Sequence, residues 1–215
     1  MLTIDLYWSF RSPFCYLVTV PLRAMQKRYQ VRINVKPVYP LVLRVPDYFL
    51  KADPKFFSYL LLDVARTAEM EGIPFGRPDP DPIVMEKSRK VAAPEQPYIY
   101  DITRMAMVAA EEGDAFPLVV AISTLIYAGT VRGWHEGSHL ETATTAAGYD
   151  YAHLRGAARD NAEALDAQIA QHDADLSAAG HWGVPTMVFQ GEPFFGFEKL
   201  DTLLWRMKQH GLEER

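Results

Sequence analysis

The segment from Leu2 to Cys15 most constrains how this chain of 215 residues can fold. Apolar and polar residues alternate from Leu2 to Trp8, which is the pattern of a strand with one face more buried than the other. The segment then reaches Ser12 and Pro13, and serine is a preferred N-cap residue while proline suits the first helical position. A strand, a tight turn and a helix start would therefore place the Ser12 hydroxyl at the positive end of a helix, where anions are stabilised.

A helical pattern and a second strand pattern follow Ser12. Apolar residues recur at helical spacing as far as Tyr29, and Pro21 is expected to kink this helix because proline removes a main-chain hydrogen bond. Apolar and polar residues then alternate again from Val31 to Val35. The start of the chain therefore predicts a βαβ unit.

Strand character returns near the C-terminus. Residues 185–189 and 193–195 flank Gly191-Glu192, which is a hairpin signal, and a single helical stripe runs from Leu200 to Met207. Between the two ends, helical patterns dominate. The helices are expected at Phe57 to Glu71, Tyr98 to Glu112, Phe116 to Ala128, Leu140 to Ala147 and Tyr151 to Ala179, the last broken near Gly156.

The stretch around Ser12 resembles the opening of a known family. Residues 5–17 read Asp-Leu-Tyr-Trp-Ser-Phe-Arg-Ser-Pro-Phe-Cys-Tyr-Leu, which is similar to 2-hydroxychromene-2-carboxylate isomerases and kappa-class glutathione transferases. Both belong to the DsbA-like branch of thioredoxin folds, in which Ser-Pro-x-Ser/Cys replaces the Cys-x-x-Cys of the redox members. The resemblance places Ser12 where the redox members carry their nucleophilic cysteine.

The order of the strand and helix patterns agrees with this resemblance over nearly the whole chain. The resemblance implies an α/β, thioredoxin-like fold with a large all-helical insertion, as in DsbA. Residues 1–40 and 180–215 would form the thioredoxin-like domain, and residues 41–179 would form the inserted helical domain. The Gly-rich and Pro-rich stretches inside the insertion are typical of loops, not of linkers between independent domains.

A second motif lies far from Ser12 in the sequence. Residues 180–186 read Gly-His-Trp-Gly-Val-Pro-Thr and resemble the family's Gly-x-x-Gly-Val-Pro-Thr stretch, whose proline follows a cis peptide bond. Because only about 5–6% of X–Pro bonds in folded proteins are cis, this expectation rests on the resemblance. The resemblance also implies that the loop faces Ser12, and that the backbone at Val184 and Pro185 pairs with the cysteinyl part of bound glutathione.

Two further stretches concern glutathione. Residues 195–201 resemble the start of the family's last helix, where a polar pair and the helix dipole hold the γ-glutamyl end. Glu198 and Lys199 would be this pair, although Phe197 stands where a polar residue is usual. Residues 59–75 resemble the family's first long inserted helix and its exit, and Phe56 stands where relatives place a glutathione-contacting lysine.

Several charged groups have an ordinary structural interpretation. Asp63 and Arg66 have the i, i+3 spacing of an ion pair on a helix surface, so we expect them to have a structural role. Residues 87–90, Lys-Ser-Arg-Lys, are typical of a solvated loop. An anionic substrate could still use this basic cluster, or Arg11 beside Ser12, as a partner for its carboxylate.

Residues 135–139, His-Glu-Gly-Ser-His, match the zinc-binding pattern H-E-x-x-H. That pattern needs a helix to bring His135 and His139 to one face, but Gly137 interrupts it and the segment reads as a loop followed by a helix start. No spacing for a third ligand follows. We therefore expect no metal site.

Composition limits the other function classes. The formal net charge of −5 argues against a nucleic-acid partner, and the single cysteine, Cys15, cannot run a two-thiol redox cycle within the chain. We expect Cys15 to be buried. No secretion signal is recognised, and the longest apolar segment, Phe116 to Ala128, is shorter than the ~18 residues that a membrane span needs. A cytoplasmic protein without a membrane partner is expected, and the resemblance implies a homodimer.

The resemblance also implies a function. It suggests a glutathione-dependent isomerase of the 2-hydroxychromene-2-carboxylate isomerase type, which acts on an aromatic small molecule by reversible thiolate addition. Ser12 would be its catalytic residue, because its hydroxyl and the helix N-terminus would orient and stabilise the sulfur of glutathione. Two alternatives stay open: a kappa-like glutathione transferase with the same site, and a non-enzymatic binding protein of the thioredoxin fold.

Overall fold

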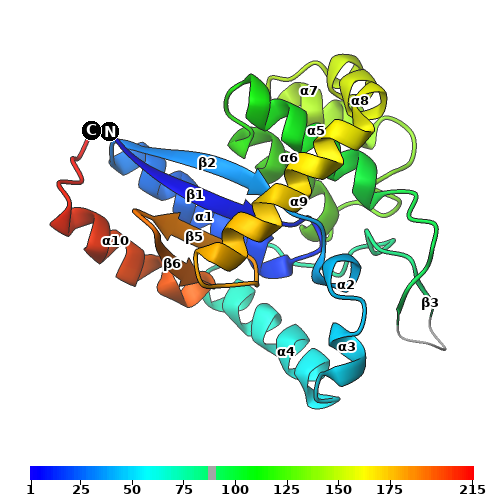
Figure 1. Cartoon of the computed structure of the whole chain (residues 1–215), viewed down its shortest axis with the longest axis horizontal. Coiled ribbons are helices and arrows are strands. Elements are labelled where there is room, and N and C mark those ends of the chain that lie inside the picture. The colour runs from blue at the N-terminus through cyan, green and yellow to red at the C-terminus, as the bar shows by residue number, and fades with distance from the viewer. Residues whose placement is uncertain (87–90) are drawn as a thin grey trace.

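The central element of the fold is a mixed sheet with the strand order β2-β1-β5-β6 (Figure 1). The computed structural model describes residues 1–86 and 91–215. The two ends of the chain meet in this sheet, although more than half of the sequence separates them. The expectation of an α/β, thioredoxin-like fold with an insertion is confirmed.

The strands lie close to where the sequence predicts them. β1 (Leu2–Trp8) pairs in parallel with β2 (Val31–Pro37), which is the predicted βαβ unit. β5 (Thr186–Phe189) pairs antiparallel both with β1 and with β6 (Glu192–Phe195). The hairpin turn consists of residues 190 and 191, which both have positive φ angles. The sequence pattern places Glu192 in this turn, but Glu192 is the first residue of β6.

Helices cover both faces of the sheet. Side chains alternate across β1, so Leu6 lies in the main core and Tyr7 lies in a smaller cluster on the other face. Tyr7 packs there with Leu176 of α9 (Ala162–Ala178). The main core includes α1 (Pro13–Arg28), which connects β1 to β2, and Figure 1 shows α9 in front of the sheet and α1 behind it.

The insertion is helical except for one short pair of strands. Its helices are α2 (Leu41–Arg44), α3 (Tyr48–Lys51), α4 (Lys55–Met70), α5 (Ile99–Glu112), α6 (Phe116–Tyr127), α7 (His139–Ala146), α8 (Tyr151–Asp160) and α9. The strands β3 (Met85–Glu86) and β4 (Val91–Ala92) pair antiparallel, so the expectation of an all-helical insertion is corrected at this point. Two residues per strand are too few for a period-two pattern to be recognised in the sequence.

The long helical pattern near the end of the insertion breaks at Asn161, not near Gly156 as expected. Gly156 lies inside α8, whereas Asn161 lies between α8 and α9. The side-chain amide of Asn161 donates to the carbonyl oxygen of Ala157 at 3.0 Å. This bond pairs a carbonyl group at the end of α8, and such local side-chain bonds are the reason that asparagine favours helix ends.

The insertion shares its core with the rest of the chain. α5 packs against β2, and α6 packs against α1. Met105 and Phe116 of these helices are buried in one cluster with Leu6 and Leu17. The last helix, α10 (Leu200–Gln209), joins the same cluster through Leu203 and Met207.

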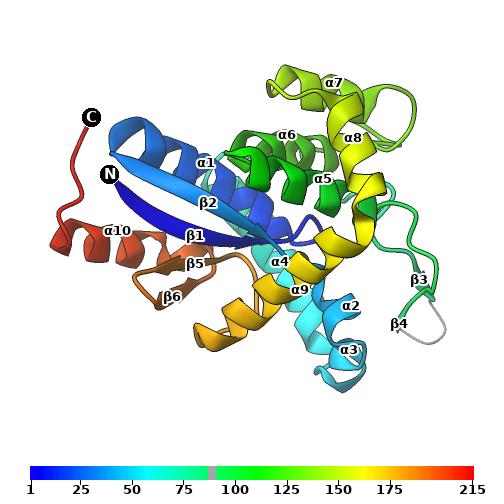
Figure 2. The ribbon, with the colours of Figure 1, turned by 45° about the horizontal axis from the view of Figure 1, so that its top comes forward.

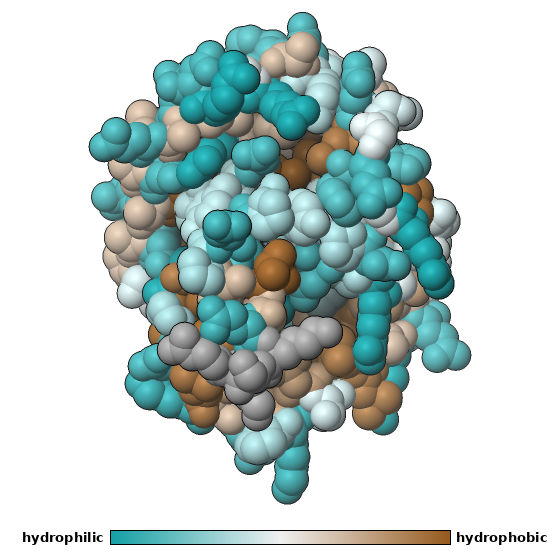
Figure 3. All heavy atoms as spheres, turned by 90° about the vertical axis from the view of Figure 1, so that its right-hand side faces the viewer, coloured by the Kyte–Doolittle hydropathy of each residue, from teal (hydrophilic) through white to brown (hydrophobic). Residues whose placement is uncertain are grey.

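The site lies where the sheet, α1 and the first inserted helices meet. Figures 1 and 2 both show α2, α3 and α4 together, near the point where β1 leads into α1. Figure 3 shows apolar side chains gathered toward the lower end of one face, the end at which Figure 1 places α3. None of the described helices is long and apolar enough to cross a membrane.

Candidate functional site

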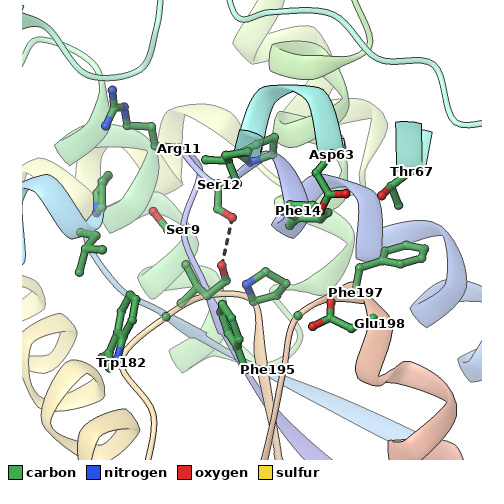
Figure 4. Close-up of a pocket in the computed structure, with 18 of the residues that line it drawn as sticks. Ser9, Arg11, Ser12, Phe14, Asp63, Thr67, Trp182, Phe195, Phe197 and Glu198 are labelled. Atoms are coloured by element: carbon green, nitrogen blue, oxygen red, sulfur yellow. Dashed lines mark hydrogen bonds between the residues drawn. The ribbon is translucent and has the colours of Figure 1, made fainter. Parts of the chain in front are cut away.

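Ser12 caps α1 and bonds to a distant loop. Its backbone is extended (φ −93°, ψ 112°), and its Oγ accepts a hydrogen bond from the Cys15 amide at 3.3 Å, while Pro13 begins the helix. The same hydroxyl donates to the carbonyl oxygen of Val184 at 3.2 Å (Figure 4). The structure thus places Ser12 at the helix N-terminus, as predicted, and brings it to the second motif.

The loop that faces Ser12 contains the expected cis bond between Val184 and Pro185. The carbonyl oxygen of Pro185 accepts from the Gly196 amide at 2.9 Å, and the Gly183 amide donates to Nδ1 of His181 at 2.9 Å. Burial lowers the pKa of His181, so its ring is neutral near pH 7. These bonds hold the loop in place opposite α1.

A cavity of about 900 Å³ opens around Ser12. In Figure 4, Ser12 lies between two groups of side chains. The first group, which we call the Arg11 side, includes Ser9, Arg11 and Trp182; the second, the Glu198 side, includes Phe14, Asp63, Thr67, Phe197 and Glu198. Val184 and Pro185 also line the cavity, so it brings together four of the five residues expected at the site.

Aromatic side chains form much of the cavity wall. The rings of Tyr48 and Trp182 are 5.2 Å apart, and the ring of His181 stacks on that of Phe195 at 4.1 Å. Trp182 and Phe195 are still 49% and 38% exposed, so flat ligands can reach them. The sequence analysis did not identify Tyr48, because the short α3 that carries it has no recognisable helical period.

Two arginines line the cavity in the described part of the chain, and both already have carboxylate partners. Arg11 binds the carboxylate of Asp81 through Nε at 3.0 Å and Nη2 at 3.2 Å. Arg44 forms an ion pair with Asp173. Arg11 is therefore engaged within the chain, which reduces its value as a partner for a substrate carboxylate. The basic residues 87–90 lie outside the described part of the chain.

Asp63 lines the cavity instead of forming the expected surface ion pair. Within the described residues, no ion pair joins Asp63 to Arg66, whose side chain is exposed. Asp63 and Thr67 lie one turn apart on α4, and both point toward the cavity (Figure 4). The missed signal was this i, i+4 pair of polar residues on a face that is otherwise apolar.

Glu198 and Lys199 differ in their positions at the start of the last helix. Both side chains are exposed, but Glu198 lines the cavity and Lys199 is not among the described lining residues. Gly196 has a φ of +94°, and a Cβ there would lie 2.5 Å from a carboxylate oxygen of Glu198. Glycine at this position therefore lets the Glu198 carboxylate lie close to the chain beside the cavity.

Cys15 is fully buried, as expected. Burial raises the pKa of its thiol from an ordinary value near 9 to about 12, and a hydrogen bond with the Ser12 side chain opposes this shift only in part. A thiol with such a pKa stays protonated near pH 7, and the thiolate is the reactive form.

The H-E-x-x-H segment does not form the helical zinc motif. His139 is the first residue of α7, and His135 lies in the preceding loop, where its ring packs 4.5 Å from that of Tyr98. In the described part of the chain, no group of three or more His, Cys, Asp or Glu side chains is arranged to hold a metal ion.

Comparison with known proteins agrees with this architecture. The solved structure of a 2-hydroxychromene-2-carboxylate isomerase matches with a TM-score of 0.72 and 20% identity, and the alignment covers 97% of this chain and 95% of that one. A probable DsbA oxidoreductase from Streptomyces coelicolor matches with a TM-score of 0.66 and 14% identity over 97% and 89% of the two chains.

A third solved structure contains glutathione. The cytosolic disulfide reductase DsbM from Pseudomonas aeruginosa, solved with GSH, matches with a TM-score of 0.61 and 18% identity over 97% and 100% of the two chains. A comparison with curated proteins finds no match. At these identities the similar structures show a shared fold.

A family model extends the comparison from structure to sequence. The model of the DSBA-like thioredoxin domain matches residues 3–208, which include both the Ser12 segment and the Val184 loop. The protein therefore belongs to the family of DSBA-like thioredoxin domains.

Proposed function

We propose that this protein is a glutathione-dependent isomerase that acts on a conjugated aromatic small molecule. The observation that carries the proposal is the position of Ser12, whose hydroxyl lies at the N-terminus of α1 and 3.2 Å from the Val184 carbonyl oxygen. Such a position stabilises an anion, and a thiolate is the anion that suits a thioredoxin-like site. Because Cys15 is buried, the sulfur would come from a bound thiol.

The cavity offers groups that suit glutathione. The Ser12 hydroxyl would hold the sulfur, the Val184 carbonyl would accept from the cysteinyl amide, and the Glu198 carboxylate would bind the γ-glutamyl ammonium group. The volume of about 900 Å³ is near the top of the ~300–1,000 Å³ range of small-molecule sites, so a second small molecule would also fit. The likeness to DsbM solved with GSH also supports this choice of thiol.

Each part of the cavity would have a separate task. When bound, glutathione supplies a nucleophilic thiolate that adds reversibly to a conjugated carbon and so lets a double bond rotate. Ser12 would donate its hydroxyl hydrogen to the sulfur instead of to Val184, and would thereby favour the ionised thiol. Tyr48 and Trp182 would stack on the aromatic ring and fix its orientation.

A binding protein for apolar ligands is the second candidate. Phe56 and Phe197 line the cavity, and a polar side chain at either position would provide a further bond to glutathione. A kappa-like transferase would use the same residues as the isomerase and would differ only in its product. A dithiol oxidoreductase is disfavoured, because the chain has one cysteine.

Calorimetry and product analysis test the proposal together. Wild-type protein should bind glutathione, and should convert a cis aromatic enone to its trans isomer while the total glutathione stays constant. Ser12→Ala should lose most of this turnover. A covalent glutathione adduct as the final product would indicate the transferase, and no measurable heat with glutathione would favour the binding protein.

A further inference from the structure

Arg11 and Arg44, the cations that line the cavity in the described part of the chain, are paired with carboxylates before any ligand enters. Arg11 forms a bidentate salt bridge with Asp81, and only 15% of its side chain is exposed. The Asp81 carboxylate is fixed in turn, because its Oδ1 also accepts from the Ile83 amide at 2.8 Å. A ligand carboxylate would have to compete with this arranged partner.

Arg44 is engaged even more completely. Its Nε donates to the carbonyl oxygen of Tyr39 at 2.7 Å, its Nη2 donates to that of Trp182 at 3.1 Å, and its Nη1 pairs with Asp173. Its side chain is 7% exposed. Arg44 therefore supports the wall of the cavity and offers no free charge to a ligand.

On the Glu198 side, the described lining residues include carboxylates but no cation. Within the described residues, neither Asp63 nor Glu198 forms a salt bridge, and both line the cavity. One ammonium group of a bound thiol would offset at most part of this charge. A second ligand with its own carboxylate would therefore be repelled, because a cavity wall screens charges less than water does.

Ser9 provides an uncharged binding group on the Arg11 side. The residue is 2% exposed, and its buried Oγ has no hydrogen-bond partner among the described residues. Ser9 lines the cavity on the same side of Ser12 as Arg11 (Figure 4). A buried hydroxyl without a partner is unfavourable, so an acceptor oxygen that reaches it would gain a bond that the protein alone does not make.

We propose that the Arg11 side holds the uncharged carbonyl oxygen of the substrate, which accepts from the Ser9 hydroxyl and from Nη1 of Arg11, the nitrogen that Asp81 leaves free. This inference rests on the proposed function, and it narrows the substrate class to neutral aromatic carbonyl compounds. It excludes aromatic carboxylates as preferred substrates.

Two unreactive ligands of nearly equal shape test this inference by binding alone. 4-Phenylbutan-2-one and 3-phenylpropanoate share a ring and a chain, and they differ in a methyl ketone against a carboxylate. Calorimetry at pH 7 should show that the ketone binds wild-type protein at least about tenfold more tightly, which corresponds to ~1.4 kcal/mol. Equal or tighter binding of the carboxylate would overturn the inference.

Variants locate the cause of the preference. Asp81→Asn keeps an oxygen for the Ile83 amide but frees the charge of Arg11, so carboxylate affinity should rise by about fivefold. Ser9→Ala should lower the affinity for the ketone by about fivefold and leave the affinity for the carboxylate unchanged. The matched control is Asp160→Asn, which removes a similar Arg partner, 3.0 Å from Arg159, on α8 and should change neither affinity. If the ratio of ketone affinity to carboxylate affinity stays at the wild-type value in both Asp81→Asn and Ser9→Ala, the assignment is contradicted.

A glutathione titration of the same wild-type sample separates this inference from the proposed function. If glutathione binds but the carboxylate is preferred, the substrate class is wrong and the proposed function stands. If the ketone is preferred but glutathione does not bind, the proposed function fails and the charge argument stands.

Discussion

The hydroxyl of Ser12 lies 3.2 Å from the carbonyl oxygen of Val184, across a separation of 172 residues in the chain. The contact joins the N-terminus of α1 to the loop before β5, and these are the two motifs that the sequence analysis singles out. Because Ser12 also caps α1 by accepting from the Cys15 amide, both its donor and its acceptor are arranged before a ligand binds. This arrangement is the basis of the predictions below.

Ser12→Ala should separate catalysis from stability. The substitution removes an N-cap bond, which is typically worth about 0.5–2 kcal/mol of unfolding free energy, so the protein should remain folded. Turnover with glutathione should fall by at least about a hundredfold, the scale of losing one stabilising donor. Urea denaturation and a rate assay on the same sample measure both effects. Full turnover in a folded Ser12→Ala protein would refute the catalytic role.

Cys15 should resist thiol reagents in the native state. Its side chain is fully buried, and burial raises the pKa of the thiol to about 12, so little thiolate is available at pH 7–8. Labelling should become rapid only when urea unfolds the chain. Rapid labelling of the native protein would show that Cys15 is accessible and would reopen the question of its reactivity.

The same pKa shift predicts how stability depends on pH. The folded state keeps the Cys15 proton above pH 9, where an exposed thiol begins to lose its proton. The stabilisation is therefore complete below about pH 9 and decreases toward pH 12, by up to about 1.4 kcal/mol per pH unit. Cys15→Ser should lose less stability than wild type between pH 8 and pH 10. Denaturation curves of both proteins at these two pH values provide the test, and parallel losses would contradict it.

Glu198→Gln and Lys199→Ala should differ in their effect on glutathione. Glu198 lines the cavity and can bind the γ-glutamyl ammonium group of glutathione. Glu198→Gln should therefore lower the affinity for glutathione by about five- to tenfold, as expected for the loss of one charge-assisted hydrogen bond. Lys199→Ala serves as the matched neighbour, because Lys199 is exposed and is not among the described lining residues. Calorimetry compares the two. A larger loss in Lys199→Ala would favour the role that the family resemblance implies for that residue.

Glutathione should owe little of its affinity to its glycyl carboxylate. The arginines that line the described cavity are paired within the chain, and Phe56 lines the cavity at the position where the family resemblance implies a lysine. γ-Glutamylcysteine should therefore bind within about threefold of glutathione, whereas Phe56→Lys should raise glutathione affinity alone, by about two- to fivefold, as an exposed charge pair would. Competition calorimetry measures both. A large loss on removing the glycine from the ligand would reveal a carboxylate contact elsewhere.

The sequence predicts the parts of the fold that depend on local patterns. The alternation in β1 and β2, the cap at Ser12 and the long amphipathic helices are read directly from neighbouring residues, and the structure confirms them. The family resemblance adds what local patterns do not contain, namely the cis bond at Pro185 and the meeting of that loop with Ser12.

The contents of the cavity are harder to predict, because they depend on contacts between distant residues. The ion pair of Arg11 with Asp81 spans 70 residues, and no spacing rule connects the two. Asp63 has the spacing of a surface ion pair, but the placement of α4 against α1 turns it toward the cavity. Ser9 is an ordinary residue in the sequence, and only its burial without a partner distinguishes it.

The most direct test of the account is the ionisation of the glutathione thiol in the complex. Ultraviolet absorbance of the thiolate can be followed against pH, and Cys15 should not contribute because its thiol stays protonated over the range used. We predict that glutathione bound to wild-type protein ionises at least about one pH unit below free glutathione, equivalent to ~1.4 kcal/mol, and that Ser12→Ala removes most of this difference. A bound thiol that ionises at the same pH as free glutathione, or equally in both proteins, would contradict the role of Ser12.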